Sequence, residues 1–474
     1  MKINIPRVLI TAEKSGAGKT VITCGILQVL KRRGFKITAY KCGPDYIDPM
    51  FHREVLGIPS YNLDTFLCGR KMVQEILIRH SMPEKQISGG QLSVIEGVMG
   101  YYDGLGGITH EASTYDVAVA TDTPSVLVVD GKGASVSMIP SIQGFLNYQD
   151  KRSKNSHIQG VILNRVSPVL YERLKGMIEE ETSVRVYGYV PEIKGGLLES
   201  RYLGLKMPKE TGEIEKRLEE LGDILEKSLD IDGLIKLAET ALPFRQKGIG
   251  KTGKDSIRQC VRVGVASDEA FSFIYQDNLD TLEEMGAQIV PFSPLHDTDF
   301  FDELDGVVLY GGYPELYAEK LSENKSMRDQ IRQKILEGMP CIAECGGFMY
   351  LTESIRNERG DIYPMCGALA GESFHTPALK RFGYVRLCKG KVFGKDVGDI
   401  FAHEFHYYDS KQCGESFEAR KPMSDRTFRC MISTDTILAG FPHIHYAGSP
   451  KVAEAFIEVC GDYQRKKQGK GRGR

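Results

Sequence analysis

Residues 12–20 read Ala-Glu-Lys-Ser-Gly-Ala-Gly-Lys-Thr, between the apolar run 8–11 and a segment whose apolar residues follow helical spacing. Glycines followed by a Lys-Thr pair are typical of a loop that binds phosphate. The backbone N–H groups of such a loop surround phosphate oxygens at the positive end of a helix. The sequence therefore predicts a strand, a phosphate loop and a helix, and with them a bound nucleotide.

Two residues of this loop have roles set by their chemistry. Lys19 is expected to reach the β- and γ-phosphates of ATP, and the hydroxyl of Thr20 to hold Mg²⁺. Glu13 replaces the first glycine of the usual pattern, and Lys14 has the spacing of the extra lysine in MinD-type loops. A glycine turn that binds nothing is the alternative. The predicted ATP-binding residues here are Lys14, Ser15, Gly16, Ala17, Gly18, Lys19 and Thr20.

Outward from the loop, short apolar runs alternate with helix-length segments, which predicts a parallel sheet covered on both faces. Further strands are expected at 37–40, 92–95, 125–129, 161–163 and 187–190. The alternation restarts at 262–266, and this predicts a second α/β domain. We expect an ATP-binding domain at 1–245, a linker at 246–260, a second domain at 261–462 and a basic disordered tail at 463–474.

The composition is that of an ordinary globular protein. The chain has 474 residues, 41% of them hydrophobic, and a net charge of −2, so neither nucleic acid nor a membrane is an expected partner. No window offers about 20 unbroken apolar residues, so no transmembrane helix is expected, and the first residues of the chain do not resemble a signal peptide. Its eleven cysteines have no framework spacing, which favours free thiols in a reducing cytoplasm.

Acidic residues follow two of the expected strands. Glu96 ends one strand, and Asp45 and Asp48 lie in a loop stiffened by proline after another. Ligands collect at the carboxyl ends of parallel strands, so these carboxylates are candidates for binding Mg²⁺ and an acceptor. The alternative for both aspartates is a turn-forming role. Asn164 follows a third strand and could donate to a purine ring or cap a turn.

A second chemical signal lies far along the chain. Cys345 stands between an apolar strand and two glycines, the setting of a nucleophile elbow. Such a turn exposes the thiol, and the N–H groups around Gly346 and Gly312 could hold an oxyanion. Two histidines, His443 and His445, could relay its proton, and both would point to one face of a strand. A buried structural cysteine is the alternative.

Two features of this second region stay open. No acidic residue follows the histidines at the spacing that would complete a catalytic triad. A further pair, His403 and His406, either lines the site or belongs to the core, because it lacks the spacing of a metalloprotease helix.

Taken together, these blocks make the chain resemble the cobyrinate a,c-diamide synthase family over nearly its whole length. Each block alone is moderately specific, and the ordered set is highly specific. The blocks lie at 14–20, 41–49, 61–66, 95–104, 310–315, 343–351 and 403–406.

The resemblance implies an α/β fold of two doubly wound domains: an N-terminal P-loop parallel sheet of the dethiobiotin-synthetase type and a C-terminal class I glutamine amidotransferase domain, flavodoxin-like. It implies a ligase that uses ATP, Mg²⁺ and glutamine to amidate the a and c carboxylates of cobyrinic acid through acyl phosphates, a step of cobalamin biosynthesis. Members of this family also lack the downstream acid of the triad.

Carried onto this chain, the resemblance makes Cys345 the nucleophile and His443 its activator. The implied metal ligands are Thr20, Asp45 and Glu96. The implied substrate-binding residues are Asp45, Tyr46, Asp48, Asp64 and Asp103. A passage for ammonia between the domains is also implied. The partners would be small molecules, and a homodimer is left open.

Other functions compete with this one. Nickel-sirohydrochlorin a,c-diamide synthase, of coenzyme F430 biosynthesis, shares the same motifs. Cobyric acid synthase is a further relative, disfavoured by the blocks at 41–49 and 62–66. A MinD-like switch ATPase would explain Lys14 but would leave Cys345 without a role, and a second domain that only binds would do the same.

Overall fold

A computed structural model describes residues 2–82, 90–148, 155–193, 211–245, 260–299 and 302–471. The chain divides into two compact units, Met1–Lys251 (the first unit) and Thr252–Arg474 (the second unit). Most of the expected linker, residues 246–259, lies outside the described residues. No helix among the described residues is long and apolar enough to cross a membrane.

The first unit is built on a seven-stranded sheet of order β4-β3-β5-β2-β6-β7-β8. Every neighbouring pair in it is parallel, as the alternation of strands and helices predicts. The strands are β2 (Arg7–Ala12), β3 (Lys36–Cys42), β4 (Ser60–Leu63), β5 (Gln91–Glu96), β6 (Ser125–Asp130), β7 (Ile158–Asn164) and β8 (Arg185–Val190). A short antiparallel pair, β1 (Lys2–Ile3) and β9 (Phe244–Arg245), joins the two ends of this unit.

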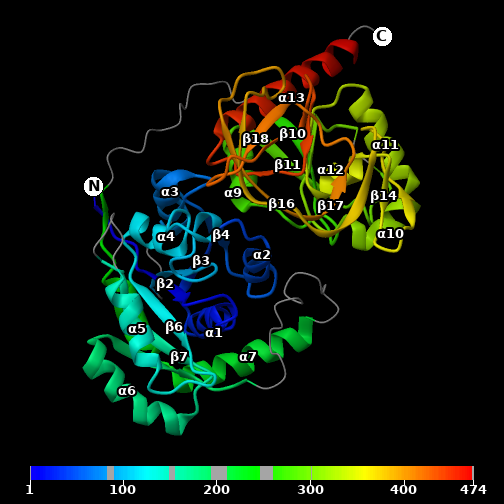
Figure 1. The fold of residues 1–474 in the computed structure, drawn as a ribbon. Coiled ribbons are helices and arrows are strands. Elements are labelled where there is room, and N and C mark those ends of the chain that lie inside the picture. Colours follow the sequence, from blue (N-terminus) through cyan, green and yellow to red (C-terminus); the bar gives the residue numbers. More distant parts are fainter. Residues whose placement is uncertain are drawn as a thin grey trace. The chain divides into compact units, whose positions relative to one another are not determined.

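Helices cover both faces of this sheet, because alternate strand residues point to opposite sides. On one face Ala39 and Val94 join a core that includes Ile26 of α1 and Leu221 of α7, and Figure 1 draws these two helices near each other. On the other face the Tyr40 hydroxyl donates to Leu77 O of α3 at 3.2 Å. The helices are α1 (Lys19–Arg32), α2 (Ile47–Glu54), α3 (Gly69–Ser81), α4 (Thr114–Thr121), α5 (Met138–Asn147), α6 (Pro168–Thr182), α7 (Thr211–Ser228) and α8 (Ile231–Glu239).

The second unit holds a six-stranded sheet of order β11-β10-β12-β13-β21-β20. All its pairs are parallel except the last, between β21 and β20. Its strands are β10 (Val261–Ala266), β11 (Ala287–Phe292), β12 (Gly306–Leu309), β13 (Cys341–Glu344), β20 (Ile432–Ser433) and β21 (Ile437–Gly440). Its helices are α9 (Gln276–Glu284), α10 (Ala318–Glu323), α11 (Lys325–Leu336), α12 (Gly346–Leu351) and α13 (Pro450–Gly471).

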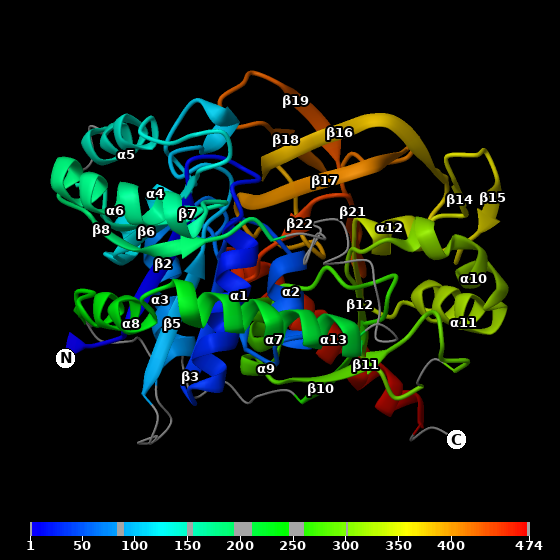
Figure 2. The same cartoon turned by 90° about the horizontal axis from the view of Figure 1, so that it is seen from below.

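A second sheet in this unit goes beyond what the sequence predicts. Its path is β15-β14-β16-β17-β22, with β18 paired to β16 and β19. Figure 2 shows its two long antiparallel strands, β16 and β17, side by side. The strands are β14 (Ser354–Arg356), β15 (Ile362–Pro364), β16 (Glu372–Cys388), β17 (Ile400–Ser410), β18 (Phe417–Arg420), β19 (Thr427–Cys430) and β22 (His443–Ile444).

The end of the chain also differs from expectation. Residues 463–471, predicted as part of a disordered tail, continue α13. The physical reason is a buried carboxylate, because Asp305 accepts from Gln464 Nε2 at 2.8 Å and pairs with Lys467 Nζ at 3.1 Å. Lys467 also donates to Leu304 O at 2.8 Å, so the basic run is tied to the body of the second unit.

Candidate active sites

The phosphate loop lies where the sequence predicts it, between β2 and α1. Gly18 caps α1 with a positive φ of 94°, a conformation that favours glycine. Asn164, at the end of β7, donates from Nδ2 to Ala17 O at 2.8 Å. A Cβ atom on Gly18 would lie 2.2 Å from that same nitrogen. Asn164 thus packs directly against the loop and helps to fix its path.

The two lysines of the loop differ in setting. Lys19 is buried, and its Nζ donates to Lys14 O at 3.1 Å and to Met99 O at 2.5 Å. Burial, and then the charge of Lys41, lowers the pKa of Lys19 to about 8. The side chain of Lys14 is 62% exposed, and its Nζ lies 3.7 Å from Asp130 Oδ2.

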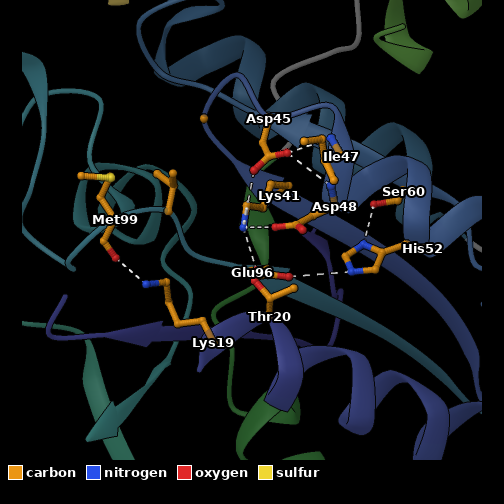
Figure 3. A network of polar contacts seen from close by, with 12 residues as sticks. Lys19, Thr20, Lys41, Asp45, Ile47, Asp48, His52, Ser60, Glu96 and Met99 are labelled. Atoms are coloured by element: carbon orange, nitrogen blue, oxygen red, sulfur yellow. Dashed lines mark hydrogen bonds and ion pairs between the residues drawn. The ribbon is translucent and has the colours of Figure 1, made fainter. Parts of the chain in front are cut away.

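A buried polar network surrounds Glu96, at the end of β5 (Figure 3). Glu96 Oε1 accepts from Thr20 Oγ1 at 2.6 Å and from Lys41 Nζ at 2.7 Å. Glu96 Oε2 is buried and has no hydrogen-bond partner among the described residues. Burial and the neighbouring charge of Asp48 raise the pKa of Glu96 to about 7. Thr20 and Glu96, far apart in the sequence, are therefore brought together.

Lys41 lies at the centre of this network, although the sequence analysis assigned it no role of its own. Its Nζ lies 2.5 Å from Asp48 Oδ2 and 3.9 Å from Asp45 Oδ2. Burial works against its charge, but the carboxylates of Asp48 and Glu96 raise the pKa of Lys41 well above its usual value. A lysine inside an apolar strand was the available signal, because buried lysines are almost always paired.

His52 is a second residue that the sequence analysis missed. It is fully buried on α2, with Nδ1 3.1 Å from Ser60 Oγ and Nε2 3.7 Å from Glu96 Oε2. Burial lowers the pKa of His52 to about 4, which keeps the ring neutral. The histidine therefore faces the free oxygen of Glu96 without adding a positive charge.

The expected substrate residues have partners within the protein. Asp45 Oδ1 accepts from the N–H groups of Ile47 and Asp48, at 2.9 and 3.2 Å, and so begins α2. Tyr46, beside it, is buried. Asp64 and Asp103 hold turns in a similar way. Asp64 Oδ1 accepts from Phe66 N at 2.8 Å, and Asp103 Oδ2 accepts from Gly100 N at 2.9 Å.

The residues around Glu96 suit a magnesium ion. Mg²⁺ prefers hard oxygen ligands, and Thr20, Asp45 and Glu96 provide a hydroxyl and two carboxylates. The unpartnered Oε2 of Glu96 is an oxygen that a cation would satisfy. The donor set of the site therefore fits the metal that the phosphate loop implies.

In the second unit, Cys345 lies at the turn between β13 and α12. Its φ of 47° and ψ of −106° are unusual for a residue with a side chain. Its N–H donates to Gly440 O at 2.7 Å, which ties the turn to the end of β21. This strand-to-helix turn has the geometry of a nucleophile elbow, but the side chain of Cys345 is buried, with 4% of the residue exposed.

His443 is the histidine that the fold brings to Cys345. A Cβ atom on Gly311 would lie 2.4 Å from His443 Cε1 and 3.4 Å from Cys345 Cβ, so both side chains border the same glycine. Burial disfavours the imidazolium, but Cys345 and then Glu344 outweigh it and raise the pKa of His443 to about 10. His445 instead lies 3.8 Å from Asp277 Oδ2, and burial lowers its pKa.

The two glycines expected to form an oxyanion hole are neighbours. A Cβ atom on Gly346 would lie 3.1 Å from the backbone nitrogen of Gly312. Backbone N–H groups from two separate segments therefore lie close to Cys345, an arrangement suited to a developing oxyanion.

The pair His403 and His406 divides between the two roles that the sequence left open. His403 lies opposite His443 in the ladder between β17 and β22, so it lines the site. Its burial lowers its pKa to about 3. His406 stacks on Phe441 with the ring centroids 4.1 Å apart, and its Nδ1 lies 2.5 Å from Tyr408 O, so it belongs to the core.

Glu344 is the residue of this site that the sequence analysis did not select. Its carboxylate is buried, with Oε2 3.6 Å from His443 Nδ1. Its Oε1 accepts from the N–H of Ile444 at 3.2 Å. The usual triad spacing predicts an acid downstream of the histidines, whereas Glu344 directly precedes the cysteine.

Comparisons with known proteins assign a family to each of two long segments of the chain. Residues 8–195 match a family described as the CobQ/CobB/MinD/ParA nucleotide binding domain, and residues 262–451 match the CobB/CobQ-like glutamine amidotransferase domain.

Curated relatives match along nearly the whole chain. A protein of Caldanaerobacter subterraneus named cobyrinate a,c-diamide synthase is 36% identical, over 97% of this chain and 99% of that relative. Proteins with the same name from Listeria innocua and Dehalococcoides mccartyi are 38% and 34% identical, over 94% and 97% of this chain and 97% and 99% of those relatives.

Proposed function

The chain belongs to the cobyrinate a,c-diamide synthase family of glutamine amidotransferase ligases, and from this premise we propose that it amidates the a and c carboxylates of cobyrinic acid. ATP would activate each carboxylate, and glutamine would supply the nitrogen. One observation carries the proposal: a single chain holds both the phosphate-loop network of Lys19, Thr20 and Glu96 and the elbow of Cys345 and His443.

In the first unit, the loop would hold the phosphates of ATP through its backbone N–H groups and Lys19. A carboxylate oxygen of the acceptor attacks the γ-phosphorus, and the bond to the β-phosphate oxygen breaks, so that ADP leaves and an acyl phosphate forms. Thr20, Asp45 and Glu96 would hold Mg²⁺, which supplies charge stabilisation for the transferring phosphoryl group.

Lys41 keeps this site assembled before the substrates arrive. Three carboxylates around one buried point repel each other, and removing them from water costs free energy. The ammonium of Lys41, within 3.9 Å of Asp45, Asp48 and Glu96, offsets both costs. It therefore holds oxygens in place that a cation and a phosphoryl group need.

In the second unit, the thiolate of Cys345 attacks the carboxamide carbon of glutamine. The N–H groups of Gly312 and Gly346 stabilise the oxyanion, and His443 gives its proton to the departing nitrogen. The carbon–nitrogen bond breaks and leaves a thioester and ammonia. Water then hydrolyses the thioester to glutamate and restores the thiol.

Ammonia would complete the reaction at the acyl phosphate. Its nitrogen attacks the activated carbonyl carbon, phosphate leaves, and an amide forms. Repetition of the cycle on the second carboxylate would give the diamide, with ADP, phosphate and glutamate as the other products.

The acceptor can be tested directly. Purified protein is incubated with ATP, Mg²⁺ and glutamine, and either cobyrinic acid or nickel-sirohydrochlorin, and the amides formed are counted by mass spectrometry. We expect two amides on cobyrinic acid. If amides form on nickel-sirohydrochlorin alone, that compound is the acceptor, and the proposed amidation chemistry still holds. ATP hydrolysis with no amide on either acceptor would overturn the proposal.

A further inference from the structure

The position of Glu344 beside His443 depends on the backbone of the next residue. Consecutive residues of a regular strand point to opposite faces, so Glu344 and Cys345 would normally diverge. The positive φ of Cys345, 47°, ends that alternation at the last residue of β13. The carboxylate and the thiol can therefore both face His443.

The two sides of the imidazole ring meet different partners. The Cε1 and Nε2 atoms of His443 lie 2.4 and 3.3 Å from the point where a Gly311 Cβ would be, the side that Cys345 also borders. Nδ1 faces Glu344 Oε2 at 3.6 Å. Glu344 Oε1 also accepts from the N–H of Ile444, the residue after the histidine. Glu344 thus lies against both the ring of His443 and the backbone N–H of the next residue.

The other titratable groups around His443 do not offer this contact. His403, opposite it on β17, is neutral and cannot balance an imidazolium. Asp277 pairs with His445 instead. Burial, and then the charge of Glu344, raises the pKa of Tyr310. Glu344 is a buried carboxylate that forms an ion pair with His443.

We propose that Glu344 is the positioning acid of this glutaminase site and takes the place of the missing downstream acid. It accepts the Nδ1–H of His443, so that Nε2 is left to receive the thiol proton, and it stabilises the imidazolium that results. No bond of glutamine is made or broken by Glu344 itself. The inference rests on the proposed function only in that the substrate is glutamine.

The test compares Glu344→Gln with Asp277→Asn, which removes the corresponding charge beside His445. The amide side chain introduced by Glu344→Gln keeps an oxygen that can accept a hydrogen bond from Ile444 N, but it carries no negative charge. The first measurement is the rate at which iodoacetamide alkylates Cys345, followed on the Cys345 peptide from pH 5 to 10. The second is glutamine hydrolysis without an acceptor, resolved into kcat and KM.

We expect Glu344→Gln to move the alkylation midpoint of Cys345 to higher pH, because the imidazolium no longer has its acid partner. We expect kcat to fall by up to about 10⁴-fold, the loss seen when the aspartate of a Ser-His-Asp triad is neutralised, with little change in KM. Asp277→Asn should leave both readouts near wild type, and Glu344→Asp should recover part of kcat.

Two outcomes overturn the inference. One is a wild-type alkylation profile and kcat in Glu344→Gln. The other is a lower kcat with an unchanged alkylation profile, which would assign Glu344 a purely structural role. Alkylation needs neither ATP nor acceptor. The alkylation experiment therefore still tests the role of Glu344 if the amidation proposal is wrong.

Discussion

At the scale of single residues, burial identifies the groups whose removal should cost most. Lys41 Nζ is a buried cation of the first site, 2.5 Å from Asp48 and 2.7 Å from Glu96. Lys14, on the phosphate loop, is exposed and 3.7 Å from Asp130. The two lysines form a matched pair, because both face carboxylates and differ mainly in their contact with water.

Lys41→Met should destabilise the first unit by about 3–5 kcal/mol, because it leaves buried carboxylates without a counter-ion. Lys14→Met should cost at most about 1 kcal/mol, the usual limit for an exposed ion pair. Urea unfolding followed by circular dichroism measures both. An equal loss of unfolding free energy in the two variants would show that the carboxylates around Lys41 do not need its charge to remain buried.

The residues that sequence reasoning missed share a physical cause. Glu344 is hidden by the alternation rule, which places it on the wrong face unless the strain at Cys345 is known. His52 has no motif around it, and its approach to Glu96 depends on how α2 packs. Lys19, Thr20 and Cys345 could be selected because their spacing and flanking glycines carry the chemistry locally.

At the scale of elements, the segment after β12 controls the approach of His443 to Cys345. Gly311 has no room for a side chain, since a Cβ atom would meet His443 Cε1 at 2.4 Å. A Cβ atom on Gly469, on α13 in the same unit, would meet nothing within 4 Å among the described residues apart from its chain neighbours and the backbone of its own helix.

Gly311→Ala should therefore push the imidazole away and reduce glutamine hydrolysis by at least about 10²-fold, the usual contribution of a positioned general acid–base group. Hydrolysis measured without acceptor, and the melting temperature, check this. Gly469→Ala should keep full activity and should not lower the melting temperature. An active Gly311→Ala enzyme would show that His443 can work from a displaced position.

The contact of α13 with Asp305 gives a second prediction at this scale. Lys467 Nζ lies 3.1 Å from Asp305 Oδ1, whereas Lys466 is exposed on the same helix. Lys467→Met should destabilise the second unit by about 1–3 kcal/mol, because a buried carboxylate loses a partner. Lys466→Met should change stability little. Thermal unfolding compares them, and equal melting temperatures would argue against the role given to Asp305.

The same elements show how far the sequence could predict the fold. The strands of the first unit follow from short apolar runs, and their parallel pairing follows from the helices between them. The second sheet of the second unit could not be found in this way, because β16 is a long strand with polar, half-exposed residues and two register shifts. Helix α13 continues past the expected end because of long-range contacts to Asp305, which composition does not reveal.

At the scale of the whole molecule, the two sites belong to separate compact units. A substitution in one site should therefore abolish the reaction of that site and leave the other site's reaction intact. Cys345→Ala should abolish amidation from glutamine but keep amidation from added ammonium salt, because only the nitrogen source is lost. Lys19→Ala should abolish both routes while Cys345 remains as reactive toward iodoacetamide as in wild type. Amide counting and alkylation rates measure this. Ammonia-dependent product from Lys19→Ala would contradict the role given to the phosphate loop.

The loop after β3 is held in place by a residue of the neighbouring strand. Asn62 donates from Nδ2 to Gly43 O at 2.9 Å and to Asp45 O at 2.7 Å. The conformation of the loop therefore depends partly on a residue outside it, on β4. A chimera in which residues 43–48 are transplanted into a relative, in order to change the macrocycle that the relative accepts, would therefore have to include Asn62 as well.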